Sequence, residues 1–247
     1  MIKTENTQKA LNTLRKVTKN EVLFLSKGQF EEKFKTKLDG NGVHYFFDEK
    51  HHICIDENIS ESEKECTYVH ECLHAILRLE GYPCCYLEGR RDFRVEEKNS
   101  LLRITGSITD AIHHPTIYER MTKDFDLDMD LYFRNLLIKK IERLELMKTD
   151  HKDDLSVVYI SQQNFIDAVE YFFYPNEVQS KLFEQVKKML PDNYGFLKGI
   201  KPKKLRFDNP ENSKSTINDI LERIKRYGQK RDAEILNERV WNLMIIK

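Results

Sequence analysis

The sequence predicts an α+β fold with a small sheet, a long central helix and a mostly helical C-terminal region. Two β-prone runs at 43–47 and 52–55 are joined by a polar loop, which is typical of a hairpin. A helix with clear start and stop signals follows at 61–80, and beyond residue 150 apolar residues recur mainly at helical spacing. With 247 residues, the chain is long enough to bury a hydrophobic core of its own.

The segment before the hairpin is expected to be helical. Apolar Leu11, Leu14 and Val17 lie at helical spacing and predict a helix over 6–26, and a short second helix is expected at 30–38. The turn-forming residues 39–42, of sequence DGNG, then lead into the hairpin. In the hairpin we expect the pair HH at 51–52 to lie in an exposed turn.

The helix at 61–80 has the clearest punctuation in the chain. Ser60 and Glu63 fit a capping box, in which each side chain accepts a hydrogen bond from the other residue's backbone amide. Gly81 follows the last helical residue, and Pro83 prevents the helix from continuing. These signals predict one long helix directly after the hairpin.

The rest of the chain contains further helical patterns. A helix is expected from 96 to 114, where Pro115 should stop it. Other helices are predicted at 129–147, 161–173, 175–189, 214–228 and 231–245, with a turn-rich stretch at 191–212. A polar break at 151–155 suggests two regions, 1–150 and 151–247, of which the second could pack on the first.

Composition excludes several classes of function. Lysine plus arginine and aspartate plus glutamate both total 41, so the net charge is zero, which argues against a nucleic-acid partner. No apolar run is long enough to cross a bilayer, and the polar N-terminus lacks the apolar core of a signal peptide. The five cysteines are an odd number, typical of reduced thiols. We therefore expect a cytoplasmic protein without a membrane partner.

The predicted helix at 61–80 contains the motif HExxH. His70 and His74 are four residues apart, so both imidazoles lie on one face of the helix and can bind one ion. Glu71 lies next to that face and can take a proton from a nearby water as a general base. Neutral imidazoles suit Zn²⁺, which is the cofactor we expect. Apolar neighbours indicate a buried helix, so the alternative is a pair of hydrogen-bonded core histidines.

Around this motif the sequence resembles the zincin-type metallopeptidases. The stretch 68–75, of sequence YVHECLHA, is similar to their active-site helix, and the hairpin before it resembles their edge strand. The resemblance covers about residues 40–125 and is closest in kind to the minimal intracellular zincins of the IrrE-like and SprT-like type. It implies a zincin-like core within 1–150, in which a small mixed sheet packs on the active-site helix. It also implies a peptide substrate bound along the edge strand.

The third metal ligand is less clearly marked. The residues after His74 lack the third histidine of the metzincin motif, and no glutamate occurs between 98 and 118 for a gluzincin-type ligand. Instead Asp110, His113 and His114 cluster at the end of the helix predicted at 96–114. Some zincin-like sequences carry Asn-x-x-Glu-Asp or Asn-x-x-Glu-His here, and their glutamate position falls on His113. We rank His113 first, His114 second and Asp110 third, while a polar helix end is the alternative reading.

Three functions remain in competition at this point. The first is a zinc-dependent metallopeptidase that hydrolyses a peptide bond in a peptide or protein substrate. Its metal ligands would be His70, His74 and His113, and Glu71 would be its catalytic base. The second is a non-catalytic zinc-binding regulatory or interaction protein on the same scaffold. The third is a helical protein in which the motif occurs by chance. Metal content and hydrolytic activity separate the three.

Overall fold

The computed structural model describes residues 4–38, 40–87, 95–147, 166–167, 169–201, 204–229 and 244–246. Within these ranges it contains eight α-helices, a three-stranded mixed sheet and a two-stranded sheet, so the α+β prediction is confirmed. The chain divides into two compact units, and each unit consists of two separate segments of the sequence. Unit 1 comprises Met1–Gly81 and Ile117–Tyr132, and unit 2 comprises Tyr82–Thr116 and Phe133–Lys247. The boundary expected near residue 150 lies outside the described residues.

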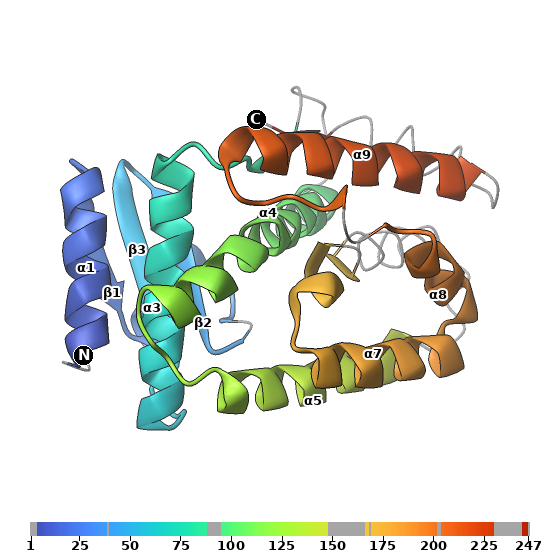
Figure 1. Ribbon diagram of the computed structural model, residues 1–247. Helices are drawn as coiled ribbons and strands as arrows, with labels where there is room; N and C mark the ends of the chain where they lie inside the picture. Colours follow the sequence, from blue (N-terminus) through green and yellow to red (C-terminus); the bar gives the residue numbers. More distant parts are fainter. Residues whose placement is uncertain are drawn as a thin grey trace. The chain divides into compact units, whose positions relative to one another are not determined.

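Unit 1 contains the three-stranded sheet, with β3 (Lys50–Ile55) in the centre (Figure 1). Strand β1 (Glu21–Leu25) pairs with β3 in parallel, and β2 (Gly42–Phe47) pairs with it antiparallel. The hairpin prediction is therefore confirmed. Asp48 and Glu49 form its turn with φ of 52° and 54°. A two-residue turn with positive φ at both positions matches the right-handed twist of the strands it joins.

The N-terminal segment differs from its prediction. Helix α1 (Glu5–Val17) begins at the Thr4 cap and ends at Val17, whereas residues 21–25 form β1 rather than the end of a helix. The run VLFL at 22–25 is β-prone, and its backbone pairs with the edge of β3 opposite β2. The Phe24 ring also stacks on Tyr68 with centroids 5.1 Å apart. Pairing with a distant strand thus outweighs the local helical pattern.

Two helices follow strands of this sheet. Helix α2 (Lys27–Phe34) begins three residues before its predicted start, because Ser26 and Gln29 form a capping box. Helix α3 (Glu61–Leu79) begins with the predicted capping box of Ser60 and Glu63. After its C-cap, Gly81 has φ of 83°, the left-handed conformation that glycine adopts without steric cost.

Helix α3 is the centre of the unit 1 core. Its residues from Cys66 to Leu77 are all buried, whereas an ordinary surface helix buries one stripe. The burial is complete because α1 packs along α3 and strands β2 and β3 also contact it (Figure 1). The polar side chains of the HExxH motif are therefore held inside packed protein. His51 and His52 are also fully buried in β3, so the exposed turn expected for them is wrong.

Helix α4 (Val95–Lys123) continues through Pro115, where the sequence predicted its end. A proline inside a helix costs about 3 kcal/mol, because it removes one hydrogen bond and crowds the preceding turn. Beyond it, Ile117, Tyr118 and Met121 are all buried at helical spacing. Burying each such side chain contributes roughly 1.5–3 kcal/mol, so the three together outweigh the cost of the proline.

Unit 2 is mainly helical, as expected for the C-terminal region. Its elements are β4 (Cys85–Leu87), the first part of α4, most of α5 (Asp130–Met147), a 3₁₀ turn η1 (Tyr171–Phe173), α7 (Asn176–Met189), α8 (Pro191–Lys198), α9 (Pro210–Gln229) and β5 (Met244–Ile246). The helices predicted at 129–147, 175–189 and 214–228 are confirmed.

Two predictions in unit 2 are corrected. Helix α8 lies within the stretch predicted as turns, and Pro191 at its first turn is compatible with a helix start. Met244–Ile246 pairs with β4 as a strand, rather than ending a helix over 231–245. Residues 230–243, and residues 161–165 and 168 of the helix expected at 161–173, lie outside the described residues.

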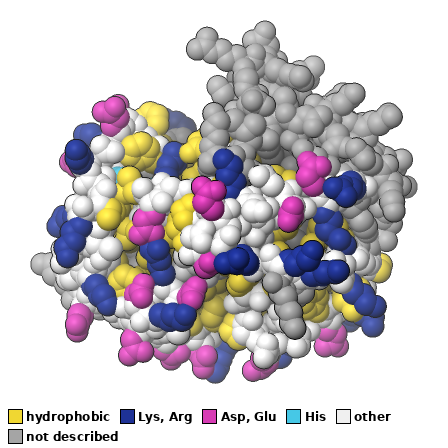
Figure 2. All heavy atoms as spheres, turned by 45° about the horizontal axis from the view of Figure 1, so that its top comes forward, with side chains coloured by type: hydrophobic (Ala, Val, Ile, Leu, Met, Phe, Trp, Pro, Cys, Tyr) yellow, Lys and Arg dark blue, Asp and Glu magenta, His cyan; other side chains and the backbone are white. Residues whose placement is uncertain are grey.

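In the described part of the chain, no helix combines the length and apolar character that crossing a membrane requires. On the face shown in Figure 2, basic and acidic side chains are interspersed, in keeping with the zero net charge. All five cysteines are buried free thiols.

Candidate metal centre

Helix α3 holds the two histidines of the HExxH motif on one buried face. His70 and His74 are each 6% exposed, and their Nε2 atoms lie 3.0 Å apart. Two nitrogens that bind one zinc ion at 2.0–2.1 Å and at a tetrahedral angle are about 3.3 Å apart. The observed separation is thus close to that of two ligands of one ion, although a histidine–histidine hydrogen bond has a similar length.

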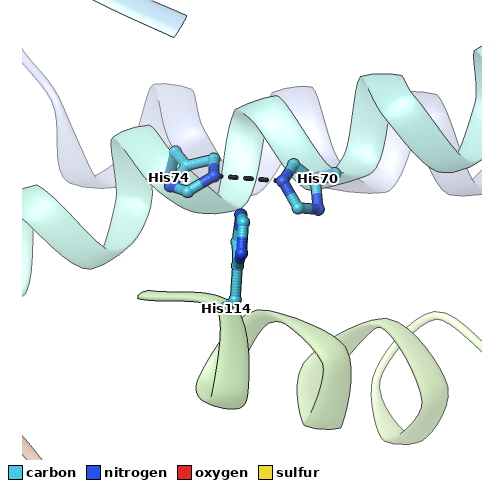
Figure 3. Close-up of side chains that lie close together, drawn as sticks. All are labelled: His70, His74 and His114. Carbon is cyan, nitrogen blue, oxygen red and sulfur yellow. Dashed lines mark hydrogen bonds between the residues drawn. The ribbon is translucent and has the colours of Figure 1, made fainter. Parts of the chain in front are cut away.

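A third histidine lies beside this pair. His114 of α4 offers a ring nitrogen, and the ligand atoms of His70, His74 and His114 all lie within 4.8 Å of one another. Figure 3 shows the His114 ring pointing from α4 toward the two rings on α3. One helical turn after His114, the Tyr118 ring lies 6.1 Å from that of His70, so this face of α4 looks toward His70. The three histidines are therefore close enough to bind a metal ion.

The structure places the other two candidates for the third ligand differently. His113 directs Nε2 to the Pro83 carbonyl oxygen at 3.2 Å and lies 3.9 Å from the Cys84 sulfur. Successive helical residues point about 100° apart, so His113 and His114 face different directions. The histidine that lies close to His70 and His74 is therefore His114, our second choice for the third ligand, and not His113, our first choice. Asp110 lies one turn before His114 on α4 and is exposed.

Around His114 the structure shows a buried polar network that the sequence did not predict. His114 Nδ1 lies 2.5 Å from Glu170 Oε1, while Lys140 Nζ and the Tyr174 hydroxyl lie 2.6 and 2.5 Å from Glu170 Oε2. Burial alone would raise the pKa of Glu170, but the charge of Lys140 and the hydrogen bonds from His114 and Lys140 outweigh it and hold this pKa well below its usual range. Glu170 is 56 residues from His114 in sequence, so no local pattern could have joined the two.

His70 has aromatic neighbours that the sequence also left unassigned. The Tyr132 hydroxyl lies 3.5 Å from His70 Nδ1, and the Tyr118 and Tyr132 rings lie 6.1 and 6.0 Å from the His70 ring. Because Nδ1 faces Tyr132 and Nε2 faces His74, the two nitrogens of His70 have distinct surroundings. This arrangement orients Nε2 toward the other histidines.

Glu71 lies on α3 beside the first residue of β2. A Cβ atom placed on Gly42 would be 3.2 Å from Glu71 Cγ and 2.5 Å from Thr67 Cγ2. Strand β2 therefore approaches α3 so closely that any side chain at position 42 would force Thr67 to move. Glu71 is 7% exposed, next to His70 in sequence, and positioned by this contact between strand and helix.

Comparison with known proteins adds no assignment: no protein-family model, curated protein or solved structure matches the chain. The three imidazole rings indicate what the site could bind. Three imidazoles form the ligand set of several catalytic zinc sites and leave a fourth position open. Imidazole also suits copper, iron and nickel, so the three histidines could hold a metal ion, and their chemistry does not select one.

Proposed function

We propose that the chain is a zincin-like, zinc-dependent metallopeptidase that hydrolyses a peptide bond in a peptide or protein substrate. One observation carries this proposal. The two HExxH histidines and His114 bring three ring nitrogens within 4.8 Å of one another, and Glu71 is next to His70 on the same helix. A chance motif in a purely structural helix gives no reason for a third histidine at this place. The sequence resemblance to minimal intracellular zincins points the same way.

Each residue of the centre has a defined role in this proposal. His70, His74 and His114 hold Zn²⁺ through neutral ring nitrogens. When bound, zinc supplies Lewis-acid chemistry, which polarises a carbonyl group and makes a water molecule easier to deprotonate. The Glu71 carboxylate would act as the general base, accepting a proton from the attacking water and returning it to the nitrogen of the leaving amine. Tyr132 keeps His70 oriented through its Nδ1 atom.

Strand β2 is the element best suited to bind a peptide. In the described part of the sheet it has β3 on one side only, so its other edge can accept a further strand. It begins at Gly42, beside Glu71, and it exposes the aromatic residues Tyr45 and Phe47 at 45% and 56%. An extended substrate paired with β2 would pass close to the general base, and its side chains could contact the two exposed rings.

A second function is favoured by the burial of the centre. His70, Glu71 and His74 are only 6–7% exposed, which leaves little open surface for a substrate at the metal. A non-catalytic zinc-binding regulatory or interaction protein needs no such access. It would bind one metal ion per chain, show no turnover, and keep its function in the Glu71→Gln variant.

The test compares zinc-loaded wild type with Glu71→Gln on a degenerate peptide mixture, with cleavage read by mass spectrometry and zinc content measured in parallel. We expect Glu71→Gln to keep its zinc and to lose roughly 10²–10⁴-fold in rate, the usual contribution of a general base. Glu65→Gln on the same helix is the matched control and should cleave like wild type. Full activity of Glu71→Gln would refute the peptidase mechanism. Stoichiometric zinc without any cleavage would favour the second function.

A further inference from the structure

We infer that Glu170 is a positioning residue of the metal centre, which fixes His114 in the one tautomer and orientation that can bind a metal ion. This inference rests on the proposed metal centre and deepens it. It assigns a role to a buried carboxylate that lies outside the HExxH motif and the cluster near Pro115. His114 and Glu170, together with Lys140 and Tyr174, all belong to unit 2.

The hydrogen bond between Glu170 and His114 decides which ring nitrogen remains available. His114 Nδ1 lies 2.5 Å from Glu170 Oε1, so the two atoms are in hydrogen-bond contact. With Nδ1 engaged, Nε2 is the nitrogen left to face His70 and His74, in agreement with the ring direction in Figure 3. A neutral imidazole that donates from Nδ1 carries its free lone pair on Nε2, as a metal ligand requires.

The donors around the second oxygen of Glu170 indicate the direction of that hydrogen bond. Lys140 Nζ and the Tyr174 hydroxyl both contact the second carboxylate oxygen, at 2.6 and 2.5 Å. Both are donors, so they stabilise the ionised carboxylate, which can only accept hydrogen bonds. With both donors on Oε2, the other oxygen of Glu170 is placed to accept the hydrogen bond from His114 Nδ1.

A purely structural role is the competing explanation, because Glu170 is 3% exposed and buried ion pairs are costly to break. The two explanations differ in what they predict for metal affinity. A carboxylate that orients a ligating histidine typically contributes 10–100-fold to metal affinity or activity, and it acts only through that histidine. A structural ion pair contributes to folding whether or not His114 is present.

The experiment measures Zn²⁺ affinity by competition with a chromophoric chelator, using the full chain. Glu170→Gln keeps the shape of the side chain and removes its charge. We expect it to weaken zinc binding by about 10–100-fold. In a His114→Ala background the same substitution should cause no further loss, because its effect passes through the missing imidazole. Glu177→Gln is the control, because it makes the same substitution at an exposed carboxylate of unit 2 that pairs with Lys181, and it should change zinc affinity less than threefold.

A second variant covers the possibility that Glu170→Gln does not fold. Glu170→Asp keeps the negative charge beside Lys140 but shortens the side chain by one methylene, which withdraws the carboxylate from His114 Nδ1. It should show the same loss of zinc affinity with a smaller change in melting temperature. The inference would be overturned if the Glu170 variants that fold bind zinc as tightly as wild type. It would also be overturned if Glu170→Gln lowers zinc affinity equally in the presence and absence of His114. If wild type and His70→Ala bind zinc equally weakly, the proposed metal centre itself is wrong.

Discussion

Replacing Gly42 by alanine tests the close approach of β2 to the helix that carries the metal ligands. The new Cβ would lie 2.5 Å from Thr67 Cγ2, 3.1 Å from the Cys54 carbonyl oxygen and 3.2 Å from Glu71 Cγ. Ordinary contacts begin at 3.4 Å, so the Thr67 methyl group must move by about 1 Å. The Cys54 and Glu71 contacts leave little room for such a movement.

The expected cost follows from two opposing terms. Overpacking a well-packed core by one methyl group costs typically 1–3 kcal/mol. Alanine also restricts the unfolded chain, which stabilises the fold by about 0.4–1 kcal/mol. Gly42 does not have positive φ, so no backbone strain is added. The net loss is roughly 1–2 kcal/mol, and for a chain of this size each kcal/mol lowers Tm by about 2–4 °C.

Thermal unfolding of four proteins provides the assay: wild type, Gly42→Ala, Thr67→Ser and the double variant. Thr67→Ser removes only the methyl group that clashes, so the double variant should recover about 1 kcal/mol relative to the sum of the single changes. Gly28→Ala is the matched control, because a Cβ there meets nothing within 4 Å. Since Gly28 lies in α2, we expect this change to stabilise the fold by about 0.5–1 kcal/mol. An unchanged Tm in Gly42→Ala, or additive effects in the double variant, would refute the reasoning.

Further predictions concern the histidine environment, the thiols and an ion pair. Tyr132→Phe should weaken zinc binding by at most about tenfold in a chelator competition, because the hydroxyl contact with His70 Nδ1 is long, at 3.5 Å. Burial raises the pKa of the Cys85 thiol to about 12, so iodoacetamide at pH 8 should label the native cysteines far more slowly than the five exposed by denaturation. The hydrogen bond from Lys27 lowers the pKa of Asp56 in the folded protein. The ionised carboxylate therefore stabilises the fold at pH values above its unfolded pKa of about 3.9, and this stabilisation is lost as the pH falls through the folded pKa. Lys27→Met should therefore be less stable than wild type at pH 7 in urea unfolding, and the difference should shrink below about pH 4.

The features that the sequence predicted are those with local signals. The hairpin follows from two β-prone runs and a polar connection, and α3 follows from its capping box and terminal glycine. His70, Glu71 and His74 could be selected because helical spacing alone places them together. Each of these patterns lies within about 20 residues of sequence.

The features that the sequence missed depend on distant contacts. Strand β1 forms because β3, some 30 residues later, offers a parallel partner, and α4 passes Pro115 because later side chains are buried. The choice between His113 and His114 required the rotation of α4 about its axis, which local spacing does not define. Glu170 joins the network of His114 only through the fold of unit 2.

The most direct test of the central claim is the zinc content of wild type and of two neighbouring variants, His114→Gln and His113→Gln. The substitutions are identical in kind and one residue apart, and both remove an imidazole from α4. We predict about one zinc ion per chain in wild type and in His113→Gln after dialysis against a weak chelator, and marked loss in His114→Gln and in His70→Ala. Zinc retained in His114→Gln but lost in His113→Gln, or no zinc in wild type, would contradict the account.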